Sequence, residues 1–169
     1  MSTKSLAYHG AGQALAYILT GKRFKYVTIN SRIEITGWLT AGHVKNVKFL
    51  HNYEYYILDP RDFIKLLIND FQCIAGYVAE AHYSGERNDT GVKSDVQRSS
   101  DVVFQSEKLA SKYSEFLFEY TKAVLTEKSN WSRLSLIAEA LVEHKKLSYK
   151  EVSAITKKNE FKMIARSIA

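Results

Sequence analysis

The scarcity of proline is the strongest constraint on what this chain can fold into. Pro60 is the one proline among 169 residues, and eight glycines accompany it. All-β folds need many tight turns, which glycine and proline usually supply. With 46% hydrophobic and 25% charged residues, the composition suits one globular domain with a buried core. It predicts a mainly helical domain over residues 1–169.

Apolar residues at helical spacing predict where the helices lie. A first helix is expected over residues 3–20, after Ser2 or Thr3, with Gly21 as its C-terminal cap. Asp59 and Pro60 form a helix-start signature, because proline is well tolerated at the first helical position. The helix that follows should end near Tyr83. Further helical periodicity covers residues 113–125, resumes at Ser129, and resumes at Ser148, where Ser148 and Glu151 match a capping box.

The segment 24–39 has a different pattern, because β-branched and aromatic residues alternate with polar ones. Two short strands are expected, the second ending near Gly37 and Trp38. A third strand is possible over residues 53–58. The predicted fold class is therefore mainly α, of the α+β type, with a small N-terminal β element.

Charge and cysteine content limit the classes of function. The net charge is +6, and residues 1–52 hold seven Lys or Arg against Glu34 alone. Such a segment can meet an acidic partner, nucleic acid or an anionic surface. The sequence has no nucleic-acid-binding motif in which aromatic residues alternate with basic ones, so a solvated basic face is favoured over nucleic-acid binding.

The lone Cys73 excludes an internal disulfide or a cysteine-based zinc cluster. With no apolar run that could span a membrane and no secretion signal, we expect a cytoplasmic protein.

The most informative motif surrounds His9. A helix carrying H-E-x-x-H places two imidazoles one turn apart to hold zinc, and its glutamate deprotonates the metal-bound water. In this sequence His9 occupies the first ligand position. Gly10 lies at the position of the general base, and Gln13 at that of the second imidazole.

The surrounding sequence resembles the peptidase domain of FtsH-type ATP-dependent zinc metalloproteases, without a counterpart of their ATPase domain. That family has AYHEAGHA, a VTI strand, a GRAAE segment, a G-x-x-[SN]-D-[LIV]-x-x-[AS] pattern and two closing helices. The corresponding segments here, in the same order, are residues 7–14, 27–29, 76–80, 91–99 and 131–152.

The resemblance implies a helical metallopeptidase-like domain with a vestigial metal site. In the family, two helix histidines and an aspartate hold the zinc; His9 and Asp95 match these ligands by position, and Gln13 does not. The resemblance also implies that the helix carrying Glu80 packs beside the site. A neutral carboxamide is a poor zinc ligand, so we expect no zinc at high affinity. Zinc remains the expected cofactor if the site is functional.

Three functions follow from this pattern. The first is a catalytically inactive FtsH-like pseudopeptidase that binds a protein or peptide partner, possibly an FtsH-like protease. The second is a zinc-dependent metalloendopeptidase with a residual or rebuilt metal site. The third, weaker one is nucleic-acid binding through the basic N-terminal third.

Under either of the first two functions, a strand edge formed by Ile35, Gly37 and Trp38 would pair with an extended peptide. The alternative is that residues 40–58 cover this edge. Replacing Gly10→Glu and Gln13→His should rebuild the zinc site, and the first change should also raise helix propensity.

Overall fold

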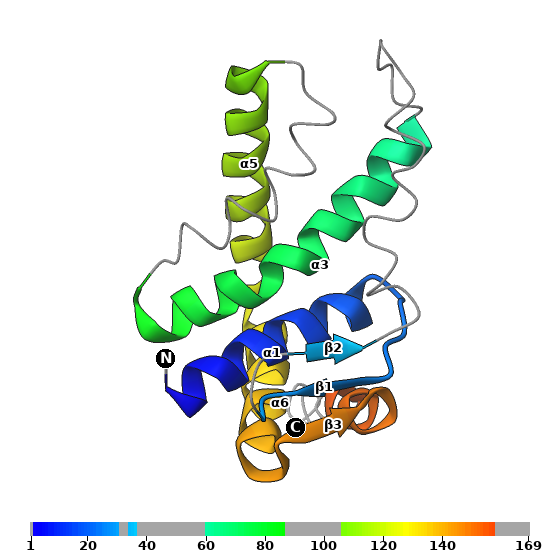
Figure 1. Ribbon diagram of the computed structural model, residues 1–169, viewed down its shortest axis with the longest axis vertical. Helices are drawn as coiled ribbons and strands as arrows, with labels where there is room; N and C mark the ends of the chain where they lie inside the picture. Colours follow the sequence, from blue (N-terminus) through cyan, green and yellow to red (C-terminus); the bar gives the residue numbers. More distant parts are fainter. Residues whose placement is uncertain (1, 31–33, 37–59, 87–105, 158–169) are drawn as a thin grey trace, which may run out of the picture.

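The computed structural model describes residues 2–30, 34–36, 60–86 and 106–157. These residues form a mainly helical domain with a small sheet, as the sequence predicts (Figure 1). In chain order the elements are α1 (Thr3–Leu19), β1 (Tyr26–Thr28), β2 (Glu34–Thr36), α3 (Pro60–Ser84), α5 (Glu107–Thr126), α6 (Lys128–His144) and β3 (Lys146–Ser148).

Local signals place the two ends of α1 where the sequence predicts them. The Ser2 hydroxyl accepts a hydrogen bond from the Ser5 backbone N–H at 3.1 Å, which satisfies one unpaired donor of the first turn. At the other end Gly21 has a φ of +69°, a left-handed conformation that glycine adopts without strain. The Lys22 N–H then donates to the Tyr17 carbonyl at 2.9 Å. These two caps fix the length of the helix on which His9 lies.

The helices α1 and α3 pack unusually closely, and Gly12 makes this approach possible. A Cβ atom at Gly12 would lie 2.4 Å from the Ala75 carbonyl oxygen and 2.6 Å from the Ala79 Cβ. Both distances are shorter than non-bonded atoms tolerate. Only glycine therefore allows the two helix backbones to approach this closely at this position.

A three-stranded antiparallel sheet lies beside α1, with the strand order β2-β1-β3. Val27, at the centre of β1, pairs with Ile35 on β2 and with Leu147 on β3. The two N-terminal strands confirm the prediction. The third strand was not predicted, because it is only three residues long and comes directly after a helix. The turn before it is made by Lys145, whose φ of 63° ends α6.

Two further helix starts show how local chemistry sets the boundaries in the second half of the chain. The predicted capping box is confirmed at the start of a last helix, described over residues 149–157, since the Ser148 N–H donates to the Glu151 carboxylate at 2.6 Å. The cap of α6 was not predicted. Glu127 accepts hydrogen bonds from the N–H groups of Ser129 and Asn130, and these bonds, with one from the Ser129 hydroxyl, lower the pKa of its carboxyl group.

The core is formed where α1, α3, α5 and α6 meet one another and the inner face of the sheet. Its largest fully buried aliphatic side chains are Leu15, Val27, Ile74, Val78, Leu117, Leu125, Leu134, Ile137, Leu141 and Val152. The helical part also buries polar groups, among them a pair in which the Tyr113 hydroxyl donates to the Asp70 carboxylate at 2.8 Å. Burial and this carboxylate raise the pKa of the tyrosine.

Within the described residues, no helix is both long and apolar enough to cross a membrane.

The contact at Gly12 gives a first prediction. We expect Gly12→Ala to lower the free energy of unfolding by about 2 kcal/mol, because the overpacking outweighs the gain of about 1 kcal/mol in helix propensity. Gly10→Ala is the matched control on the same helix, since its Cβ would meet only side-chain methyl groups, at 3.2 Å and beyond, and no backbone atom of another element. Urea unfolding of both variants measures the difference. A Gly12→Ala variant as stable as Gly10→Ala would contradict the close packing.

Candidate functional site

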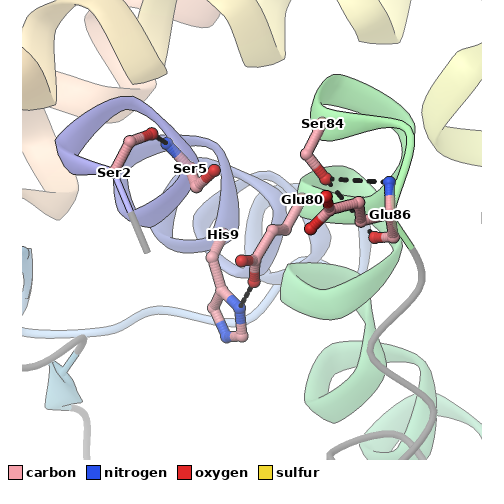
Figure 2. A network of polar contacts seen from close by, with 6 residues as sticks. All are labelled: Ser2, Ser5, His9, Glu80, Ser84 and Glu86. Carbon is pink, nitrogen blue, oxygen red and sulfur yellow. Dashed lines mark hydrogen bonds and ion pairs between the residues drawn. The ribbon is translucent and has the colours of Figure 1, made fainter.

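The centre of the candidate site is a buried pair between His9 on α1 and Glu80 on α3. The His9 Nδ1 lies 3.1 Å from the Glu80 Oε2, within hydrogen-bonding distance (Figure 2). The two side chains are 8% and 10% exposed, so little water competes for this contact. Because 71 residues separate the pair in the sequence, the contact depends on how the two helices pack.

The His9 ring is also held in place by the backbone of α3. A Cβ atom at Gly76 would lie 2.4 Å from the ring Cδ2 and 2.5 Å from the Nε2. The Tyr77 ring meets the imidazole edge to face, with 4.7 Å between the ring centres. A larger residue at position 76 would therefore displace the imidazole. Gly76 has a positional role that the sequence pattern did not show.

The hydrogen bond to Glu80 decides which nitrogen of His9 remains available. A neutral imidazole that donates from Nδ1 to a carboxylate keeps its lone pair on Nε2. Metal-bound histidines commonly have this arrangement, in which an outer carboxylate orients the ring. A histidine that only joins two helices can have it as well. The pair therefore fixes the orientation of the ring but does not by itself show what the ring binds.

Gln13 lies one helical turn after His9, and both side chains face α3, as the spacing of four residues predicts. The Gln13 Cγ would be 3.0 Å from a Cβ at Gly76, the same glycine that contacts the His9 ring. The structure thus brings the first and second predicted ligand positions to one place on α3.

Gly10 faces a different direction from these two residues. A Cβ there would lie 3.2 Å from Val27 Cγ2, 3.4 Å from Leu141 Cδ1 and 3.6 Å from Ile29 Cγ2. A longer side chain at this position would therefore begin among three aliphatic groups. We therefore expect the gain in helix propensity from Gly10→Glu to be outweighed, because burying a carboxylate without a partner costs more free energy.

The remaining predicted site residues are described only in part. Ile35 lies on β2, which pairs with β1 on one side and is an outer strand of the described sheet. Asp95, Gly37 and Trp38 lie outside the described residues, as does the possible strand over residues 53–58. The match of Asp95 to a ligand position therefore stays a prediction.

The described part of the site does not fit a tightly bound zinc ion. Here His9 offers one imidazole nitrogen and Gln13 a neutral amide, whereas protein zinc sites use three or more nitrogen, sulfur or carboxylate ligands. Across the ranges that the structure describes, no group of three or more His, Cys, Asp or Glu side chains is placed to hold a metal ion. We therefore derive no chemical step through zinc.

An aromatic cluster lies next to His9 in the chain and joins three helices. Tyr8 on α1 stacks on Tyr83 of α3, with ring centres 4.0 Å apart, and on Trp131 of α6 at 5.5 Å. The His82 ring meets Trp131 edge to face at 4.4 Å. These rings join the start of α1, the end of α3 and the start of α6. The sequence pattern did not reveal this cluster, because its members come from three separate segments.

No protein-family model and no curated protein matches the chain. The similarity to FtsH-type peptidases therefore rests on the quoted motifs, and the site is interpreted from its own geometry.

A second prediction tests the buried pair. Glu80→Leu leaves the buried His9 Nδ1 without its acceptor, and we expect a loss of about 1–3 kcal/mol in the free energy of unfolding. Glu80→Gln keeps an acceptor oxygen in nearly the same volume and should lose less. Urea unfolding at neutral pH compares both variants with the parent protein. Equal stability of Glu80→Leu and the parent would show that the contact contributes nothing.

Proposed function

We propose that this chain is a catalytically inactive, FtsH-peptidase-like module that binds an extended segment of a partner protein. The observation that carries the proposal is the arrangement of α1. Its histidine is oriented by a carboxylate as in a metallopeptidase, while the positions for the base and the second ligand hold Gly10 and Gln13.

The direction of Gly10 supports the absence of catalysis. Loss of a general base alone commonly costs a factor of 10² to 10⁴ in rate, and here a ligand is lost as well. Within the described residues, the carboxylate that contacts the His9 ring is that of Glu80, and position 10 faces aliphatic groups instead. Glu80 is already engaged by the imidazole. A water molecule held at the His9 Nε2 would therefore meet no general base at position 10.

The outer strand β2 supports peptide binding. It packs beside α1, the helix that carries His9, and its pairing with β1 uses only one of its two edges within the described sheet. An extended peptide can add to such an edge through main-chain hydrogen bonds. This binding needs neither a metal ion nor a base, so it can persist where catalysis is lost.

A third prediction separates binding from cleavage. We expect unfolded casein to bind the protein and to remain intact, because the edge strand is present and the catalytic groups are not. Fluorescence anisotropy of labelled casein measures binding, and gel electrophoresis after long incubation measures cleavage. Cleavage that a chelator abolishes would favour the alternative, an active metalloendopeptidase. Absence of both binding and cleavage would contradict the proposal.

A fourth prediction tests whether the bound peptide forms a strand. In an extended peptide only alternate N–H groups face the neighbouring strand, and the side chains alternate between the two faces. We would use a peptide of about six residues that alternates apolar and polar side chains, which fixes its register. N-methylation of one alternate set of amides should abolish binding, and methylation of the other set should leave it unchanged. Equal effects of the two sets would contradict strand addition.

A further inference from the structure

Basic residues from two distant parts of the chain meet along one side of the sheet. One group lies between α1 and β1, and the other lies around β3. We call them together the basic strip, which consists of Lys22, Arg23, Lys25, Lys145, Lys146 and Lys150. The excess of basic over acidic residues in the sequence lies in the N-terminal third. The fold adds the second group of basic residues, from the C-terminal part of the chain, to the same surface.

The pairing of β1 with β3 brings the two groups together, and Figure 1 shows these strands side by side. Tyr26 pairs with Ser148, and Thr28 pairs with Lys146. Beyond the strand the Ile29 N–H donates to the Lys145 carbonyl at 3.0 Å. The paired strands are three residues long, and the cations lie on them and on the residues directly before and after them.

The charge of the strip is only partly neutralised. Five of its six side chains are exposed, and Lys22 is half-buried. The acidic residues beside it are Glu143 and Glu151, and Glu34 lies across β1 on the other neighbouring strand. Glu151 accepts hydrogen bonds from Ser148, which lower the pKa of its carboxyl group and keep it ionised. Among the described residues, the six cations of the strip outnumber these three carboxylates, which leaves a net positive charge.

Two tyrosines lie among these cations. The Lys146 Nζ is 3.8 Å from the centre of the Tyr26 ring, and the Arg23 Cζ is 6.0 Å from that of Tyr149. Both rings are half-buried and so remain partly open to solvent. Cations interleaved with aromatic rings are typical of surfaces that bind single-stranded nucleic acid, where the bases stack and the phosphates pair with the cations. A surface that binds an acidic protein segment would need only the cations, and the tyrosines would have no role in it.

We propose that the basic strip binds single-stranded nucleic acid. The strip lies along β3, on the opposite side of β1 from β2. The inference is therefore independent of peptide binding at β2, and either one can fail without the other.

The test uses the full chain with a labelled oligothymidylate and a labelled oligouridylate, each of about twelve nucleotides. Fluorescence anisotropy at several salt concentrations gives the affinity and its salt dependence. With about four phosphate contacts, the affinity should fall roughly fiftyfold between 50 and 200 mM salt.

A pair of triple variants locates the binding surface. Lys25→Gln, Lys145→Gln and Lys150→Gln together remove three charges from the strip, and we expect an affinity at least tenfold weaker with a shallower salt dependence. The matched control is Lys4→Gln, Lys108→Gln and Lys122→Gln, which removes three exposed charges from α1 and α5. Its affinity should stay within about threefold of the parent.

Three results would overturn the inference. The first is that neither oligonucleotide binds the parent protein at 50 mM salt. The second is that both triple variants weaken binding equally, which would mean that only the overall charge matters. The third is that a polyglutamate peptide of equal charge competes as well as an unlabelled oligonucleotide, which would assign the strip to acidic protein segments.

Discussion

The close contact between α1 and α3 is the interaction on which the rest of the structure depends. Two glycines make it possible. The missing side chain at Gly12 leaves room for the backbone and a side chain of α3, and the missing side chain at Gly76 leaves room for the His9 ring. The contact brings Glu80 to His9 and buries both. It also places α1 between α3 on one side and α6 with the sheet on the other. The site is therefore a consequence of helix packing, and small residues at two positions determine it.

Local rules predicted most of the helical part. The ends of α1 follow from Ser2 and Gly21, and the start of the last described helix follows from Ser148 and Glu151, because capping residues act over only three or four positions. The strands β1 and β2 were predicted from β-branched and aromatic residues that alternate with polar ones. Local rules could not predict β3, whose three residues form a strand only because β1 is beside them. The Glu127 cap was missed because glutamate is not among the usual capping residues.

The candidate site shows the same division between local and tertiary information. Helical spacing alone predicts that His9 and Gln13 share a face, and the structure places both against Gly76. The direction of Gly10 depends on where β1 and α6 lie, which spacing does not specify. The His9–Glu80 hydrogen bond joins residues 71 positions apart. Its signal in the sequence was indirect, through the resemblance that placed the helix of Glu80 beside the site.

Metal analysis tests the central claim, that α1 keeps the framework of a metallopeptidase helix without its metal chemistry. The protein would be purified without added metal, dialysed against a mild chelator and analysed by mass spectrometry under native conditions. We expect far less than one zinc ion per chain, because an imidazole and an amide bind zinc weakly compared with a full set of three ligands. Retention of one zinc ion per chain would contradict it, because residues beyond His9 and Gln13 would then complete a working metal site.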